Sequence, residues 1–308
     1  MEFANQGITI LKFQLAANGP VDLYLSTIAV TEIPSDRQAF ADNYLYRASW
    51  IDDVPVLFKA QVIDDNTVEV TVLPADSRHL PRGPIVERAV RRKLSLDLDL
   101  GAFYQFVSTI PQLSEFATRQ RGLRPIIKDS LLEALVLAVM DQQVNVSFAA
   151  QLKGRFLERY GRCYELDGIE LRLFPAPEQM AQLEVAELKT IQLTGNRSGA
   201  IISLAQEYLA GKNWPDTTGT GDEIIPELCL LKGIGPWTAE YSALVGLGLL
   251  DTLPAADIAL MRSIEKLYGL SARPTEKEVR ELAQHWSPWK GLVTLYLWHR
   301  DEMEALGL

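Results

Sequence analysis

Cysteine and histidine are both scarce in this chain of 308 residues. The two cysteines, Cys163 and Cys229, are too few for a disulfide framework or for any site built from four thiolates. The histidines His79, His285 and His299 stand far apart and lack the spacing of metal ligands. We therefore expect no metal centre and no disulfide scaffold, and a reducing compartment is the expected location.

Long apolar runs and an excess of basic charge are absent too. No stretch approaches the roughly 20 apolar residues that a bilayer span needs, and Met1 to Leu11 has neither the basic start nor the apolar core of a signal peptide. The chain carries 30 Lys and Arg against 40 Asp and Glu, a net charge of −10. An overall field of this sign does not hold a protein on nucleic acid, so such binding would need a local basic face. We expect a cytoplasmic protein without membrane contacts.

The N-terminal third has the alternating, β-branched patterns that are typical of strands. Turn-forming residues such as Asn18-Gly19-Pro20 and Asp64-Asp65-Asn66 separate the candidate strands. These patterns predict an antiparallel sheet with two helices, a mixed α/β domain over residues 1–98. The predicted strands are Ile8–Phe13, Ser49–Ile51, Val54–Val62 and Thr67–Leu73.

From about Asp99 onward the apolar residues recur with helical spacing. Ser130 followed by Glu133 makes a capping box before a strongly apolar helix, and Thr275 with Glu278 repeats the device. Residues 99–308 are therefore predicted to form an all-helical body. The expected fold class is α+β, an antiparallel-sheet domain followed by helices.

The most specific motif places Gly233 and Gly235 one residue apart, directly before Pro236. It lies between a short predicted helix, Pro226 to Leu230 with Asp222 near its start, and a second helix that Pro236 begins. Two glycines allow a tight hairpin with positive φ and no Cβ, so that backbone N–H groups and a helix N-terminus can approach a phosphate. This predicts a helix-hairpin-helix near residues 226–250. Glycine pairs also occur at ordinary corners between helices, so the motif alone leaves both interpretations open.

A carboxylate follows the hairpin by 24 positions, at Asp257 (257 − 233). Pro254 breaks the chain just before it, and an amphipathic helix begins at Asp257 and runs to Tyr268. A helix N-terminus favours a negative charge at this place. Asp257 is thus either an ordinary N-cap, worth ~1 kcal/mol, or an anionic catalytic group beside the hairpin.

Together these motifs resemble the helix-hairpin-helix DNA glycosylase superfamily, in its AlkA-type 3-methyladenine branch. The resemblance covers residues from about 99 to the C-terminus, and the order of strands fits the mixed α/β domain that precedes the helices in these enzymes. It implies a helical body of two subdomains with the active-site cleft between them. The matching segments are Gly233–Ala239, Pro254–Asp257, Trp286–Trp289, Arg121–Pro125, Gln142–Val146 and Leu193–Arg197.

The resemblance implies that Asp257 is the catalytic aspartate, which activates water or stabilises the positive charge on the deoxyribose as the N-glycosidic bond breaks. Trp237 stands where the bifunctional glycosylase/lyase relatives carry a lysine nucleophile. Lys232 lies on the wrong side of the two glycines to replace that lysine. Without the amine no Schiff base can form, so we predict a monofunctional enzyme that leaves an abasic site.

Three aromatic residues, Trp237, Tyr241 and Trp298, match positions that line the base pocket of AlkA-type enzymes. Trp237 and Tyr241 are four apart and share one helix face. An electron-rich aromatic pocket suits purines alkylated at N3 or N7, because the resulting cationic ring gains cation–π attraction. Without the motifs around them, aromatic side chains at this spacing would be expected in the hydrophobic core.

The resemblance also implies which residues touch DNA. Gln143 matches the side chain that fills the gap left by a flipped nucleotide, a position where AlkA has leucine; its alternative is a capping or surface amide. A second departure is Ala256, where AlkA has another acid. The remaining expected contacts with DNA are made by the hairpin residues Lys232, Gly233, Ile234, Gly235 and Thr238.

The leading hypothesis is therefore a monomeric DNA glycosylase of base-excision repair, acting on alkylated purines in damaged double-stranded DNA at the nucleoid. The alternatives are a non-catalytic helix-hairpin-helix DNA-binding protein and an oxidised-purine glycosylase with lyase activity. No cofactor is expected, with a monovalent cation at the hairpin left open. Basic residues cluster in three places whose convergence on one face the sequence does not reveal: Arg88–Lys93, Arg119–Lys128 and Lys153–Arg162.

Overall fold

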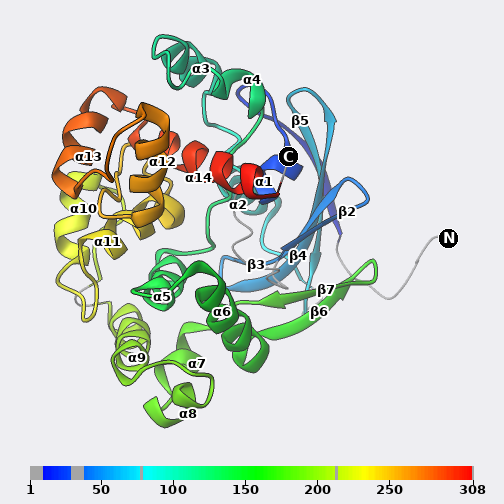
Figure 1. Cartoon of the computed structure of the whole chain (residues 1–308). Helices are drawn as coiled ribbons and strands as arrows, with labels where there is room; N and C mark the ends of the chain where they lie inside the picture. The colour runs from blue at the N-terminus through cyan, green and yellow to red at the C-terminus, as the bar shows by residue number, and fades with distance from the viewer. Residues whose placement is uncertain (1–9, 29–37, 77–78, 212–213, 307–308) are drawn as a thin grey trace. The chain divides into compact units, whose positions relative to one another are not determined.

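The computed structural model describes residues 10–28, 38–76, 79–211 and 214–306. The chain divides into two compact units, of which the first contains the β-sheets and the second is helical (Figure 1). The α+β class predicted from the sequence is confirmed. The predicted boundary after residue 98 stays a prediction. The first unit comprises Met1–Ala102, Arg121–Asp129 and Gly154–Pro175, and the second Phe103–Gln120, Ser130–Lys153 and Ala176–Leu308.

Five antiparallel strands form the main sheet of the first unit, in the spatial order β1-β5-β4-β3-β2. The four predicted strands correspond to β1, β3, β4 and β5, although Ile8 and Thr9 lie outside the described residues. Strand β2 was not predicted, because its four residues are too few to show a strand period. The strands are β1 (Leu11–Ala16), β2 (Gln38–Ala41), β3 (Tyr44–Ile51), β4 (Val54–Asp64) and β5 (Thr67–Pro74).

Alternation along the strands gives this sheet two apolar faces. Phe58 and Val70 pack with Val86 of helix α2 in the larger core. Leu57, which neighbours Phe58 and points the other way, packs with Leu171 of a β-hairpin that covers the second face. The remaining elements of this part are α1 (Leu23–Ile28), α2 (Gly83–Lys93), β6 (Arg162–Leu166) and β7 (Ile169–Leu173).

The second unit consists of helices. The boundaries between the two units fall within α3 and within α6, so each of these helices has residues in both units. Apart from Glu133 and its last residue, Asp141, helix α5 is apolar on all sides, and its residues from Leu131 to Met140 are all buried. It packs against α9, α11 and a π-helical turn, Ala243–Leu247. The helices are α3 (Leu100–Ser108), α4 (Phe116–Arg119), α5 (Leu131–Asp141), α6 (Val146–Tyr160), α7 (Pro177–Ala181), α8 (Val185–Thr190), α9 (Gly195–Ala210), α10 (Gly221–Leu228), α11 (Pro236–Ser242), α12 (Ile258–Tyr268), α13 (Glu276–Leu282) and α14 (Lys290–Leu306).

Capping residues set several of these helix starts. The Ser130 hydroxyl accepts the Glu133 N–H at 3.1 Å, and Thr275 with Glu278 forms the predicted capping box. The prediction for the helix before the hairpin was wrong: α10 begins at Gly221 and ends at Leu228, with Pro226 inside it. A capping box from Thr220 starts this helix five residues before the proline, which lacks an N–H but does not end the helix.

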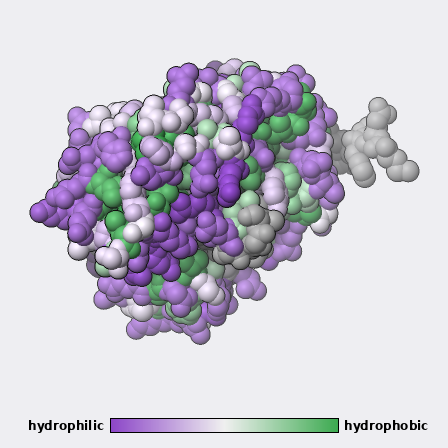
Figure 2. Space-filling view, turned by 45° about the horizontal axis from the view of Figure 1, so that its top comes forward, coloured by the Kyte–Doolittle hydropathy of each residue, from purple (hydrophilic) through white to green (hydrophobic). Residues whose placement is uncertain are grey.

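The surface carries few large apolar groups. Figure 2 shows a largely hydrophilic face on which hydrophobic side chains form small, separate patches. Within the described ranges, no helix is both long and apolar enough to span a membrane. The most exposed of the large hydrophobic side chains placed there is Leu230, just before the hairpin. Single exposed side chains of this kind are ordinary on a protein surface.

Candidate active site

Of the two glycines in the hairpin between α10 and α11, only Gly233 has the positive φ that the sequence predicts. Gly233 has a φ of 81°, and a Cβ added to it would lie 2.8 Å from the Cβ of Ala200 on α9. Gly233 is therefore required both for its left-handed backbone and for the close approach of α9. Gly235 is different, since its φ of −98° and ψ of 175° suit any residue and a Cβ there would meet nothing within 4 Å. It is the N-cap of α11, so the first N–H groups of that helix lie beside an open surface.

The other hairpin residues expected to touch DNA differ in exposure. Lys232 is exposed, whereas the side chains of Ile234 and Thr238 are buried. The Ile234 N–H donates to the carbonyl of Leu231 at 3.2 Å. Because both side chains are buried, any contact of these residues with DNA would have to use the main chain, and the Ile234 N–H is already bound within the hairpin.

Asp257 lies at the N-terminus of α12, where the sequence analysis placed it. Its Oδ1 accepts the backbone N–H of Leu260 at 2.7 Å, which makes it the N-cap. The indole N–H of Trp298 also donates to Oδ1, at 3.2 Å, and the indole N–H of Trp237 donates to Oδ2 at 3.0 Å. Neutral donors on both oxygens stabilise a negative charge without cancelling it.

The three aromatic residues predicted from the sequence form one cluster beside this carboxylate. The rings of Trp237 and Tyr241 are nearly parallel, with centroids 5.4 Å apart and planes inclined by 16°. Trp298, from α14, lies 5.9 Å from Tyr241 at 49°. All three side chains are partly exposed, so the cluster is not sealed core. Here a cationic aromatic ring could stack on the π-faces of the cluster, and a positive charge next to that ring would lie near the Asp257 carboxylate.

Gln143, the predicted wedge, occupies the exposed tip of the turn between α5 and α6. The sequence analysis missed two residues beside it, Gln142 and Arg197. The Gln142 side-chain N–H2 donates to the carbonyl of Gly233 and to the Thr238 hydroxyl, each at 2.9 Å, and the Arg197 guanidinium donates to the Gln142 carbonyl. Both residues stand in motifs that had been noted, but nothing in the sequence shows that the two motifs meet.

Many of the clustered basic residues are bound to protein partners. Arg124 is buried and donates to four backbone carbonyls, those of Pro20, Ser95, Leu98 and Asn18. Further cations pair with carboxylates, so the sequence clusters do not mark a single DNA-binding face. Arg88 and Arg159 are among the cluster members that remain exposed. The paired cations are Arg91 with Asp97, Lys93 with Asp129, Arg121 with Asp65, Lys153 with Asp141 and Arg162 with Asp76.

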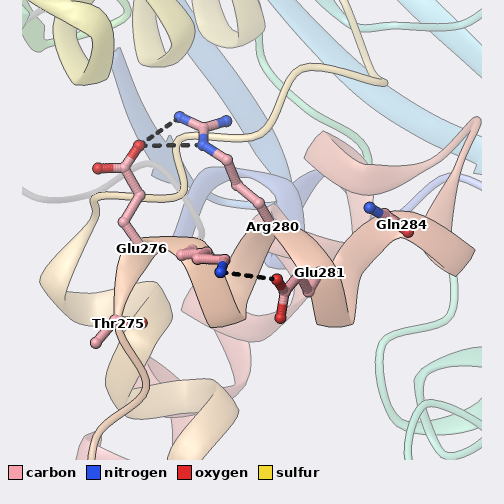
Figure 3. A pocket seen from close by; sticks show the side chains of 6 residues that line it. Thr275, Glu276, Arg280, Glu281 and Gln284 are labelled. Atoms are coloured by element: carbon pink, nitrogen blue, oxygen red, sulfur yellow. Dashed lines mark hydrogen bonds and ion pairs between the residues drawn. The ribbon is translucent and has the colours of Figure 1, made fainter.

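A shallow pocket lies on α13 and contains none of the predicted site residues (Figure 3). Its charged side chains pair with one another, Arg280 with Glu276 and Lys277 with Glu281. Arg280 also reaches Glu240 of α11 at 2.7 Å. Burial raises the pKa of the Glu240 carboxyl above its ordinary value, although Arg280 acts in the opposite direction. This pocket therefore has a structural network rather than reactive groups.

No group of three or more His, Cys, Asp or Glu side chains is placed to hold a metal ion in the part of the chain that the structure describes. The site consists instead of one carboxylate, three aromatic rings and a hairpin that ends at the N-cap of α11. Residues 136–288, which include the hairpin and Asp257, match the HhH-GPD superfamily of base excision DNA repair proteins. Over 268 residues the chain is 31% identical to the DNA-3-methyladenine glycosylase of Bacillus subtilis, covering 83% of this chain and 86% of that protein. The chain belongs to the HhH-GPD superfamily.

Further similar proteins agree with this assignment. DNA-3-methyladenine glycosylase 2 of Escherichia coli is 29% identical over 240 residues, which cover 75% of this chain and 81% of that enzyme. The solved structure of a 3-methyladenine DNA glycosylase from Archaeoglobus fulgidus covers 96% of this chain and 99% of its own, with a TM-score of 0.83 and 22% identity. At that identity the structural likeness establishes the fold. The family named from the sequence motifs is thereby confirmed.

Proposed function

We propose that this protein is a monofunctional DNA glycosylase that hydrolyses the N-glycosidic bond of alkylated purines in duplex DNA. The lesions are of the 3-methyladenine and 7-methylguanine type, and the product is an abasic site for base-excision repair. The observation that carries the proposal is the contact between Asp257 and the indoles of Trp237 and Trp298, which places an anion against an aromatic cluster. The relatives named DNA-3-methyladenine glycosylase support the same substrate class.

The chemistry follows from charge. A purine methylated at N3 or N7 is cationic, so it departs as a neutral base when it takes the electron pair of the N-glycosidic bond. The positive charge then lies on the deoxyribose, where the Asp257 carboxylate lowers its energy. Water adds its hydroxyl to the sugar and releases a proton to solvent. Both Asp257 oxygens already accept N–H bonds, which favours an electrostatic role over that of a general base.

DNA binding in this proposal uses the hairpin. The N–H groups at the start of α11, with Lys232 beside them, would hold a backbone phosphate. Such contacts carry no sequence information, as an enzyme that searches all DNA requires. We propose that the protein acts as a monomer on damaged duplexes at the nucleoid, with Gln143 in the gap left by the flipped nucleotide.

Incubation with methylated duplex DNA tests the proposal directly. We expect the release of free methylated purines and intact strands that break only after a later alkaline treatment of the abasic sites. Duplex DNA without methylation is the control. The absence of base release would favour a non-catalytic DNA-binding protein. Release coupled to strand cleavage would contradict the assignment of Trp237 to the place of the lysine nucleophile.

The Gly235→Asp variant tests the hairpin. Because a side chain at Gly235 meets no neighbouring atom, the variant should fold, while its carboxylate repels the phosphate. A like charge at about 4 Å costs ~1 to 4 kcal/mol near a surface, so duplex affinity should fall at least about fivefold. Damaged and undamaged duplexes should lose affinity equally, in an equilibrium binding titration at low salt.

Gly235→Ala is the matched control for that variant, since it adds the same Cβ without charge. Gly233 is unsuitable for this test, because any side chain there would strain the backbone and contact Ala200. A loss confined to damaged DNA, or an equal loss in the alanine variant, would contradict the role of the hairpin as a phosphate clamp.

A further inference from the structure

The turn between α5 and α6 holds Gln143 in a backbone conformation that glutamine rarely adopts. Gln142 has φ −56° and ψ 127°, and Gln143 follows with φ 52°, the pattern of a type II turn. Glycine is the usual residue at that third position. The Gln143 side chain is exposed, so packing in the core does not explain why a glutamine stands there. Strained exposed residues of this kind are commonly functional.

Gln142 connects this turn to the hairpin. Its Nε2 donates to the carbonyl of Gly233 at 2.9 Å and to the hydroxyl of Thr238 at 2.9 Å. Its own carbonyl accepts from the guanidinium of Arg197 on α9. Three segments that are distant in sequence therefore meet at Gln142, and all of them belong to the second unit.

The residue before the turn, Asp141, is fixed by an ion pair that does not involve Gln142. Lys153 on α6 places its Nζ 2.6 Å from Oδ1 of Asp141, and these side chains are only 5% and 12% exposed. The chain is thus fixed by an ion pair before Gln142 and by hydrogen bonds at Gln142. Gln143 follows this fixed base directly and is exposed to solvent.

We infer that Gln142 is a positioning residue that braces Gln143 against the hairpin. The inference rests on the proposed function, in which the hairpin grips the strand and Gln143 fills the space of the flipped nucleotide. A side chain that keeps a base out of the stack must resist its return, which is favourable by a few kcal/mol. The hydrogen bonds of Gln142 to the hairpin keep the turn in place, so that Gln143 can resist the return of the base while the hairpin holds the phosphate. Without the Gln142 amide, the turn loses its connection to Gly233 and Thr238.

The Gln142→Leu variant tests this brace, because leucine is of similar size and has no hydrogen-bonding group. Single-turnover excision should be measured on one lesion in two duplexes, opposite its normal partner base and opposite an abasic site. We expect about a tenfold loss in the paired duplex, the scale of two neutral hydrogen bonds. The unpaired lesion needs little energy to flip, so its excision should fall by less than about twofold.

Two further variants separate the brace from a folding defect. Gln284→Leu makes the same chemical change at an exposed position on α13's pocket and should leave both rates unchanged (Figure 3). Gln143→Gly removes the wedge and places glycine at the left-handed position, so it should show the same loss on paired DNA without a lower Tm. An equal loss of Gln142→Leu on both duplexes, or no loss on either, would overturn the inference.

A fluorescence readout keeps the inference separate from the proposed activity. The base analogue 2-aminopurine beside the lesion brightens when the stack opens, whether or not a base is released. If the wild-type protein brightens it but releases no base, the proposed activity fails while the brace can still be judged. Equal brightening by wild type and by Gln142→Leu would then show that Gln142 has no part in opening the duplex.

Discussion

Replacement of Asp257 by asparagine is expected to slow the excision of alkylated purines at least about 10²-fold, the scale of one lost electrostatic stabiliser. Asparagine is also a good N-cap, so its oxygen can still accept the Leu260 N–H and α12 should keep its start. The negative charge is lost, and with the oxygen kept on the Leu260 side the amide N–H2 takes the place of Oδ2, where it faces the indole donor of Trp237. Single-turnover excision and duplex affinity measure the two consequences separately, and affinity should be retained.

Asp222→Asn is the matched control, because it removes the same charge from the exposed first turn of α10. Its excision rate should equal that of the wild type. An unchanged rate in Asp257→Asn would remove Asp257 from the mechanism. If affinity and melting temperature fell together with the rate, the loss would reflect the role of Asp257 as a cap rather than as an anion beside the sugar.

Acid should destabilise the protein through His299 before most carboxylates are protonated. His299 on α14 is fully buried, and neither ring nitrogen has a hydrogen-bond partner among the described residues. Burial lowers its pKa from 6.5 to about 4. Between pH 6.5 and 4 the imidazole of His299 is protonated in the unfolded chain but stays neutral in the folded chain. The free energy of unfolding present above pH 6.5 is therefore lost progressively as the pH falls toward 4. The loss amounts to about 3 kcal/mol for this group.

The His299→Leu variant should remove this dependence. Its free energy of unfolding, from denaturant titrations at several pH values, should decline less steeply than that of the wild type between pH 6.5 and 4. Its stability at pH 7 should not fall, because leucine removes two unsatisfied buried nitrogens. His285→Leu is the control, since His285 is exposed. If the free energy of unfolding fell equally with pH in wild type and in His299→Leu, protonation of the imidazole would not destabilise the folded protein, and the prediction would be wrong.

The parts of the site that depend on neighbouring residues could be predicted from the sequence. A proline at the start of α11 and a capping carboxylate at the start of α12 act within one helical turn, so Pro236 and Asp257 mark their helix starts reliably. The positive φ of Gly233 follows from the same kind of local rule. At α10 two local signals conflicted: Thr220 and Glu223 have the capping-box spacing, and they, not Pro226, mark the start of the helix.

Charge clusters in the sequence gave no reliable guide to the DNA-binding face. Arg124 and Lys153 stand among other basic residues, yet both are buried on protein acceptors. Their partners lie elsewhere in the chain, and burying a cation is favourable only where such acceptors surround it. No pattern of neighbouring residues reports those distant partners.

The sequence by itself determined the family of this protein, its fold class and the residue types of its site, since these follow from motifs, periodicity and helix caps. Only the tertiary structure decided that two indoles donate to Asp257, that Gln142 reaches Gly233, and that the ring of His299 is buried without a hydrogen-bond partner among the residues that the structure describes. Local propensities act over a few residues, whereas these contacts join helices up to about ninety positions apart. Their geometry exists only after the helices that carry them have packed together.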